Sequence, residues 1–204
     1  MKANEEDRIH LGIVSYSFQL RLSAERAQRP GKASRQSERP KQASGDLNDP
    51  LHFLDYCHRL GAGGIQLDLG MRDKSYVTKL RQQAESHGMY LEGSIRLPRD
   101  KSDADRFASE VRTAKEAGAK VIRTVMMSGR RYEIFDSADA FRRAAEQALE
   151  SLRLAEPIVA REDVLLAIEN HKDWRVDELV DILRRLKSGH VGVCVDFGNS
   201  IALL

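Results

Sequence analysis

The chain has 204 residues, with 33 Lys and Arg residues against 31 Asp and Glu residues and a net charge of +2. Hydrophobic residues make up 41% of it and charged residues 31%, which is typical of a globular protein in solution and excludes a disordered chain or a membrane protein. The near-balance of charge also gives no sign of a nucleic-acid-binding protein.

The length and the cysteine content narrow the class further. A chain of this length can bury one substantial core, so we expect one domain over residues 1–204. The first residues lack the positive flank and long apolar run of a secretion signal, and no window is apolar enough to cross a bilayer. Cys57 and Cys194 are too few for a disulfide framework, which favours a reducing, cytoplasmic location.

Strands and helices are predicted to alternate along the chain. The predicted strands cover residues 10–18, 64–70, 89–98, 120–127, 164–169 and 191–197. The predicted helices cover residues 49–61, 72–88, 102–118, 137–156 and 175–189. Asp49, which precedes Pro50, and Ser102 are typical N-cap residues. Four helices are predicted to close at a glycine, at Gly61, Gly88, Gly118 and Gly189.

This alternation predicts a parallel α/β fold, either an open doubly wound sheet or a (β/α)8 barrel of the TIM type. Residues 64–70 and 91–97 favour the barrel, because apolar side chains there alternate with polar ones instead of filling both faces. The polar positions are Gln66, Asp68, Glu92, Ser94 and Arg96. A complete barrel needs roughly 250 residues, so we expect an incomplete, C-terminally truncated barrel with about six β/α units.

Residues 21–48 interrupt the pattern after the first strand. The segment is rich in Arg, Lys, Ser and Gln, and residues 21–46 carry seven basic groups against three acidic ones. With few large apolar residues it cannot form a core of its own, which predicts a basic, flexible insert. A loop of this length on the catalytic face either attracts an anionic substrate or is simply solvated.

Two carboxylates are predicted to meet at the mouth of the barrel. Glu169 ends the fifth strand and Asp196 lies at the end of the sixth, and the carboxyl ends of parallel barrel strands converge on one face. Neighbouring carboxylates repel each other unless a cation lies between them. We therefore predict a divalent metal at this pair, Mn²⁺ or Mg²⁺ in preference to Co²⁺ or Zn²⁺, because the ligands are oxygens.

The residues alone leave a structural alternative open for this pair. Glu169 could instead form an ion pair with Arg96 or Arg123 and close the core. Arg130 and Arg131, just past the fourth strand, suit a phosphate or a carboxylate, although two solvated loop charges would explain them equally.

The motifs AIENHKDW (residues 167–174) and GVCVDFGNS (residues 192–200) resemble the fifth- and sixth-strand motifs of the xylose-isomerase-like sugar phosphate isomerase/epimerase superfamily. The phrases LDYCHRLGAGGIQ, GMYLEGSIRLP and FRRAAEQALESLRLAEP are similar to that superfamily as well. The resemblance implies a TIM barrel that uses a divalent metal. It makes Glu169 the first metal ligand and the catalytic acid/base, and Asp196 the second ligand. The His and Glu that complete the ligand set on later strands have no counterpart here.

Further polar residues near the predicted mouth are candidates for substrate binding. They are His171, Lys172, Trp174, Asn199, Arg96 and Glu92. Asn199 stands where some epimerases have a substrate-contacting His. For the residues of the two loops a structural role remains equally open, as a loop cap, a surface group or a packing residue.

The resemblance implies a metal-dependent isomerase or epimerase that moves a proton next to the carbonyl of a sugar or a sugar phosphate. One alternative is an endonuclease IV-like enzyme that cleaves DNA at abasic sites. Such enzymes gather three zinc ions with several histidines, whereas the second and third strands here end in Asp68 and Arg96. The other alternative is a non-catalytic fragment. We expect a small-molecule partner and no nucleic acid or membrane, and leave homo-oligomerisation open.

Overall fold

The computed structural model describes residues 11–19, 23, 46–201 and 203, and within them it contains one six-stranded parallel sheet. The strands are β1 (Gly12–Val14), β2 (Gly64–Leu67), β3 (Tyr90–Ser94), β4 (Val121–Thr124), β5 (Leu165–Glu169) and β6 (Val191–Cys194). They lie in sequence order, each parallel to the next. A doubly wound sheet would reverse its order at a switch point, so the partial TIM-barrel type is confirmed.

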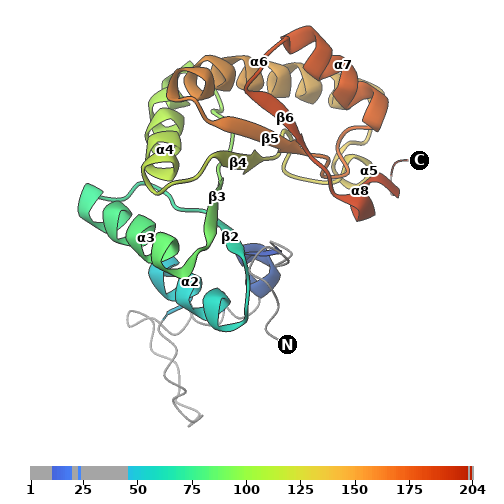
Figure 1. Ribbon diagram of the computed structural model, residues 1–204. Coiled ribbons are helices and arrows are strands. Elements are labelled where there is room, and N and C mark those ends of the chain that lie inside the picture. The colour runs from blue at the N-terminus through green and yellow to red at the C-terminus, as the bar shows by residue number, and fades with distance from the viewer. Residues whose placement is uncertain (1–10, 20–22, 24–45, 202, 204) are drawn as a thin grey trace, which may run out of the picture.

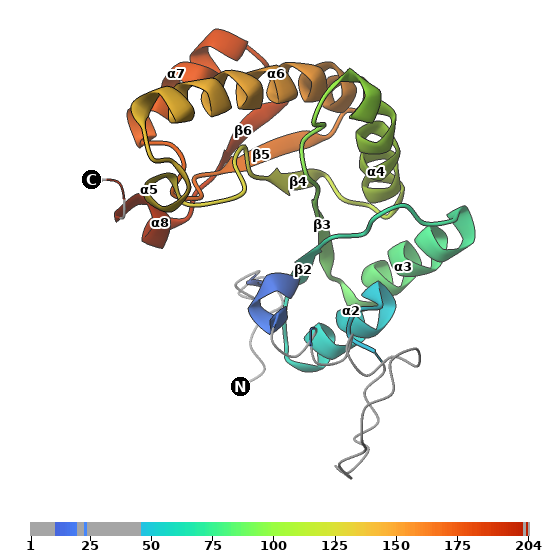
Figure 2. The ribbon, with the colours of Figure 1, turned by 180° about the vertical axis from the view of Figure 1, so that it is seen from behind.

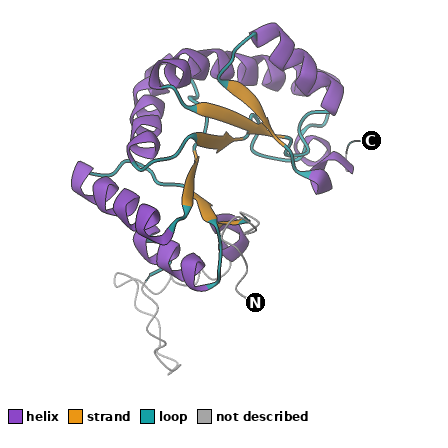
Figure 3. Cartoon of the chain, in the orientation of Figure 1, coloured by secondary structure: helices purple, strands orange, loops and turns teal. Residues whose placement is uncertain are grey.

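The long helices lie on the outer, convex side of the curved sheet (Figures 1 and 2). The long ones are α2 (Pro50–Arg59), α3 (Lys74–His87), α4 (Ala104–Glu116), α6 (Ala138–Glu162) and α7 (Val176–Leu186). The short ones are α5 (Arg131–Ile134), α8 (Phe197–Ile201) and the 3-10 turns η2 (Ser15–Phe18) and η3 (Lys101–Asp103). Helices α5 and α8 lie beside each other near the carboxyl ends of β5 and β6. Figure 3 shows this arrangement, with the long helices on one side of the strands.

Two of the predicted helix starts are confirmed by their caps. Asp49 accepts hydrogen bonds from the backbone N–H groups of Leu51 and His52, and Pro50 takes the first helical position of α2. Ser137 accepts from the N–H of Ala140 at the start of α6. A side-chain oxygen at this position satisfies a donor that the first turn of a helix leaves free.

The predicted start of one helix and the predicted end of another are wrong. Ser102 is not a cap, because Asp100 accepts from the N–H groups of Ser102 and Asp103 and begins the 3-10 turn that precedes α4. Gly189 does not end α7; Lys187 does, with a left-handed φ of 53°. Gly88 closes α3 as predicted, with a φ of 62°.

Further boundaries differ from the prediction, and β2, β3 and β4 each end earlier than the predicted Gly70, Pro98 and Met127. The first strand is only Gly12–Val14, and the 3-10 turn η2 replaces its second half. The sixth strand ends at Cys194, and α8 follows it where no helix was expected. Helix α6 continues through Pro157 to Glu162. Its last turns bury apolar side chains, so packing outweighs the helix-breaking tendency of proline there.

The core lies between the sheet and the outer helices. The outward-facing strand residues Ile65, Ile122, Leu166 and Ile168 are fully buried beside helical residues such as Phe107. The polar residues that alternate with them are only partly buried. The predicted division into an apolar outer face and a polar inner face is therefore observed for β2 and β3. In β5 the inner face begins with Leu165 and Ala167 and becomes polar only at Glu169.

The predicted insert at 21–48 lies outside the described residues except for Ser23 and its last three positions. There Leu47 is buried in the core, and Asp46 accepts hydrogen bonds from both the backbone and the side chain of Asn48. Among the described helices, none has the length and apolar content that crossing a membrane requires.

Candidate active site

The structure brings the two predicted carboxylates together through Asn199. Glu169 is the last residue of β5 and pairs in register with Cys194 at the end of β6, two residues before Asp196. The backbone N–H of Asn199 donates to Asp196 Oδ1 at 3.0 Å, and its side-chain Nδ2 donates to Glu169 Oε1 at 3.3 Å. Asn199 is buried, so both acids are anchored to one fixed residue of α8.

Asn170, which the sequence prediction missed, holds the segment just past β6 in place. Its Nδ2 donates to the carbonyl oxygen of Asp196 and to Ser200 Oγ, each at 2.8 Å, and its Oδ1 accepts from the N–H of Asp196 at 2.6 Å. The side chain is only 7% exposed. The signal that could have found it is its place directly after Glu169, where a strand end needs a polar side chain to satisfy the neighbouring backbone.

Arg123 on β4 forms an ion pair with Glu169. Its Nε donates to Glu169 Oε2, its Nη2 forms the ion pair with the same oxygen, and its Nη1 donates to Ser94 Oγ at 3.4 Å. The side chains of Arg123 and Glu169 are 23% and 14% exposed. This is the ion pair that the sequence left open as an alternative to a metal site, with Arg123 and not Arg96 as the partner.

The polar layer continues across the inner face toward β2. Gln66 Nε2 donates to Glu92 Oε2 at 2.9 Å, so Glu92 lies on the inner face as predicted. Burial, followed by the negative charge of Glu169, raises the pKa of the Cys194 thiol above its usual value. The negative charges of Glu92 and Asp196 raise the pKa of this thiol further, and the positive charge of Arg123 opposes them.

The loop after β5 is held by a buried carboxylate. Asp173 is fully buried and accepts hydrogen bonds from the backbone N–H groups of His171, Trp174 and Met127. Burial raises the pKa of Asp173 above its ordinary value, because the charged form loses its solvation there. Lys172 in the same loop has a left-handed φ of 66°. Asp173 therefore ties the loop after β5 to the loop after β4.

The predicted substrate residues of this loop differ in their surroundings. Trp174 is 7% exposed and packs edge-to-face against Phe141, with ring centroids 5.6 Å apart. Among the described residues, neither Trp174 Nε1 nor His171 Nδ1 has a hydrogen-bond partner, although both atoms are buried. These two atoms are therefore not engaged by Glu169 or Asp196.

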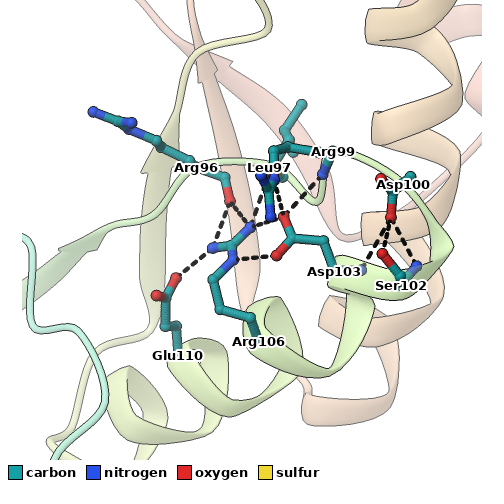
Figure 4. A network of polar contacts seen from close by, with 8 residues as sticks. All are labelled: Arg96, Leu97, Arg99, Asp100, Ser102, Asp103, Arg106 and Glu110. Atoms are coloured by element: carbon teal, nitrogen blue, oxygen red, sulfur yellow. Dashed lines mark hydrogen bonds and ion pairs between the residues drawn. The ribbon is translucent and has the colours of Figure 1, made fainter.

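A network behind β3 fixes the backbone of Arg96 (Figure 4). Arg106 of α4 donates to the carbonyl oxygen of Arg96, to both carboxylate oxygens of Asp103 and to Glu110. The side chain of Arg96 is exposed and points away from this network. The hydrogen bonds from Arg106 hold the pKa of Asp103 well below its usual range.

The paired arginines after β4 are not brought together as an anion site. Arg130 forms an ion pair with Glu133 at 2.6 Å. Arg131 forms one with Glu178 of α7 at 2.8 Å and lies over the ring of Phe141, with its guanidinium carbon 3.5 Å from the centroid. Both guanidinium groups already face carboxylates. Arg130 fits the interpretation as a solvated charge, whereas Arg131 is partly buried and links α5 to α7.

The carboxylate pair offers the type of ligand atom that a hard divalent metal ion prefers. Glu169 and Asp196 offer oxygen ligands, and Asp196 Oδ2 has no hydrogen-bond partner among the described residues. Over the ranges described, no three or more His, Cys, Asp or Glu side chains are grouped to hold a metal ion. The residues present therefore fit two positions of a ligand set, and Glu169 is meanwhile ion-paired with Arg123.

A curved parallel sheet with outer helices, a polar inner face and acids at its strand ends defines a TIM-barrel-type α/β protein. The chain belongs to the xylose isomerase-like TIM barrel family, whose sequence profile matches residues 54–203. No curated protein sequence matches it significantly.

The fold is similar to those of known sugar epimerases. The structure of 3-keto-D-glucoside 4-epimerase from E. coli matches with a TM-score of 0.62 and 14% identity, over 83% of this chain and 68% of that one. D-psicose 3-epimerase, solved in the presence of D-fructose, matches with a TM-score of 0.62 and 12% identity, over 75% and 60%. L-ribulose 3-epimerase matches with a TM-score of 0.62 and 14% identity, over 95% and 62%. The chain thus spans about two thirds of the length of the first of these epimerases and less of the other two.

Proposed function

We propose that this site transfers a proton at the carbon next to a sugar carbonyl, as an isomerase or an epimerase. The observation that carries the proposal is the joint anchoring of Glu169 and Asp196 by Asn199 at the carboxyl ends of neighbouring strands. Active sites of TIM-barrel enzymes lie at this face of the sheet. The xylose isomerase-like family and the epimerases of similar fold support the same class of reaction.

Glu169 is the proposed acid/base. One of its oxygens removes the proton from the carbon, the electron pair of the broken C–H bond moves toward the carbonyl oxygen, and an enediolate forms. Isomerisation is completed when Glu169 returns the proton to the neighbouring carbon and the hydroxyl proton of that carbon passes to the former carbonyl oxygen. Epimerisation instead requires that a proton from solvent reach the original carbon on the face opposite to Glu169. Without a metal, Arg123 of β4 places a positive charge beside this carboxylate.

Glu169 and Asp196 would also hold the divalent metal, Mn²⁺ or Mg²⁺ in preference to Co²⁺ or Zn²⁺. When bound, such an ion polarises a carbonyl and stabilises the negative charge of an enediolate. Asn170 holds the backbone of Asp196 and Asn199 donates to its carboxylate, so both would help to position this ligand.

The substrate is proposed to be a sugar or a sugar phosphate that lies along the polar inner face. Glu92, Arg96 and Asn199 would contact its hydroxyl or anionic groups, and His171 and Lys172 would approach it from the loop after β5. Trp174 remains in this set as a proposal, although its packing against Phe141 suits a structural role as well. The two free cysteines support a cytoplasmic location as part of the same proposal.

Exchange of substrate hydrogen with solvent tests this proposal whatever the product is. The protein is incubated in D2O with Mn²⁺ and a panel of ketoses, aldoses and their phosphates, and deuterium incorporation next to the carbonyl is followed by NMR. We expect incorporation into at least one sugar, lost in Glu169→Gln and retained in Arg153→Met, a charge change on the outer surface of α6. Incorporation that survives Glu169→Gln would refute the assignment of Glu169, and absence of exchange with every sugar would refute the proposed reaction.

The nuclease alternative gains no specific support. Asp68 past the end of β2 accepts a hydrogen bond from the N–H of Gly70, and the exposed Arg96 follows β3, so neither position offers a histidine. Cleavage of a DNA duplex that contains an abasic site is therefore not expected.

A further inference from the structure

The guanidinium of Arg123 occupies one side of the carboxylate that the proposed function assigns to a metal. We propose that Arg123 controls metal binding, because its guanidinium and a divalent cation compete for Glu169. Arg123 is then a positioning residue with two alternative roles, as the counter-ion of Glu169 without metal and as a displaced group with metal. The inference rests on the proposed function for the identity of the ligands, but it makes a separate statement about affinity.

The geometry of the ion pair is the first support. Both Nε and Nη2 of Arg123 address the same oxygen, Glu169 Oε2, while Asn199 Nδ2 donates to Oε1. Each oxygen of Glu169 is thus already engaged by a donor. A metal ion can reach Oε2 with good geometry only where the guanidinium moves aside, because two cations at one oxygen repel each other.

The charges around the pair give the second support. Glu169 and Asp196 carry two negative charges, and Arg123 neutralises one of them, which leaves a net charge of −1 for a divalent ion to meet. Removal of the guanidinium would leave a net charge of −2, which matches the charge of the ion. The side chains of Arg123 and Glu169 are partly buried, so solvent screens these charges less than it would on an open surface.

A second anchor for Arg123 makes its displacement possible within the fold. Arg123 stands in register with Ser94 of β3, and its Nη1 already lies 3.4 Å from Ser94 Oγ. Glu92 lies two residues earlier on the same strand and the same inner face, and its carboxylate accepts from Gln66. A guanidinium that leaves Glu169 therefore turns toward a hydroxyl and an acid on β3 and does not lose every partner.

Titration with MnCl2 tests the competition directly, by calorimetry and by the EPR signal of free Mn²⁺. We expect Arg123→Met to bind Mn²⁺ at least about tenfold more tightly than the wild type, a gain that a merely structural role for Arg123 would not produce. Arg123→Lys, which keeps the charge, should stay near the wild type. Arg153→Met is the matched control, because it removes an equal charge from an exposed pair with Glu150 on α6.

The gain must also depend on the proposed ligand. The double variant Arg123→Met with Glu169→Ala should lose the added affinity, and Arg123→Gln serves as a second neutral variant that retains hydrogen-bonding capacity if Arg123→Met melts early. Neutral variants that bind Mn²⁺ no more tightly than the wild type would overturn the competition, and so would a gain that survives Glu169→Ala. If Glu169→Ala leaves the Mn²⁺ affinity of the wild type unchanged, the proposed metal site itself fails, which distinguishes the two failures.

Discussion

Asn170 holds Asp196 by both polar groups of its backbone, donating to its carbonyl oxygen at 2.8 Å and accepting from its N–H at 2.6 Å. One side chain thus joins the end of β5 to the segment just past β6, where no regular strand pairing continues. The position of the Asp196 carboxylate is set by this contact together with that of Asn199.

Replacement of Asn170 should therefore affect both the fold and the site. Asn170→Ala leaves the N–H and the carbonyl oxygen of Asp196 without this partner, and we expect a loss of about 2 kcal/mol in the free energy of unfolding. Asn170→Asp keeps the acceptor but loses the donor, so its free energy of unfolding should lie between those of the wild type and Asn170→Ala. Chemical denaturation measures the difference. An Asn170→Ala protein as stable as the wild type would show that the contact does not contribute to stability.

The Asp49 cap offers a test of local structure far from the site. Asp49→Ala removes the acceptor for two N–H groups of the first turn of α2 and should cost about 1 kcal/mol of stability. Asp49→Ser, which can still cap, should recover most of it. Because Tyr76 Oη also donates to Asp49 Oδ2, at 3.0 Å, part of the loss belongs to the α2–α3 contact, and Tyr76→Phe measured alongside separates the two contributions.

The Asp103 network predicts a specific loss of stability in acid. The pKa of Asp103 is lowered in the folded state, so its ionised form stabilises the fold above the unfolded value of about 4. That contribution is lost as the pH falls below about 4 toward the lowered folded pKa. Asp103→Asn should be less stable than the wild type by about 2 kcal/mol at pH 7.

The difference between Asp103→Asn and the wild type should shrink as the pH falls below about 4. Denaturation curves at a series of pH values measure it, with Asp105→Asn as the control, because Asp105 lies in the first turn of α4, which Asp103 precedes as its N-cap residue. A difference that stays constant down to the lowest pH would rule out Asp103 as the group responsible.

The fragment alternative makes a prediction about the whole chain. The buried contacts between the sheet and the outer helices predict one cooperative thermal transition. Among the described strands, β1 and β6 each pair with one neighbour only, so their outer edges could join a second copy. Size-exclusion chromatography with thermal melting checks both points. A broad, non-cooperative transition would favour a poorly folded fragment.

The sequence was sufficient for the architecture because its pattern is regular. Apolar residues such as Ile65 alternate with polar ones such as Gln66, and this period of two is what distinguishes a barrel from a sheet that is buried on both faces. The caps at Asp49 and Ser137 depend on residues within the first turn of their helices, so they too could be predicted from the local sequence. The end of α6 could not be predicted in this way, because Pro157 is tolerated inside the helix only through tertiary packing.

The site was predictable in outline but not in its connections. That Glu169 and Asp196 lie at neighbouring strand ends follows from strand order alone. Which cation faces Glu169 depends on the register of β4 against β5, and this decides for Arg123 over Arg96. Asn170 and Asp173 contact backbone groups of other loops, and although the place of Asn170 after a strand end was a signal, the local sequence could not identify these partners.

The central claim is that two acids at adjacent strand ends form one cation site. It is tested most directly by measuring Mn²⁺ binding to the wild type, to Glu169→Ala and to Asp196→Ala. The ion pair with Arg123 leads us to expect weak binding by the wild type, and each substitution should reduce it at least about tenfold. Tight binding that persists in both variants would place the metal elsewhere on the molecule and contradict the account.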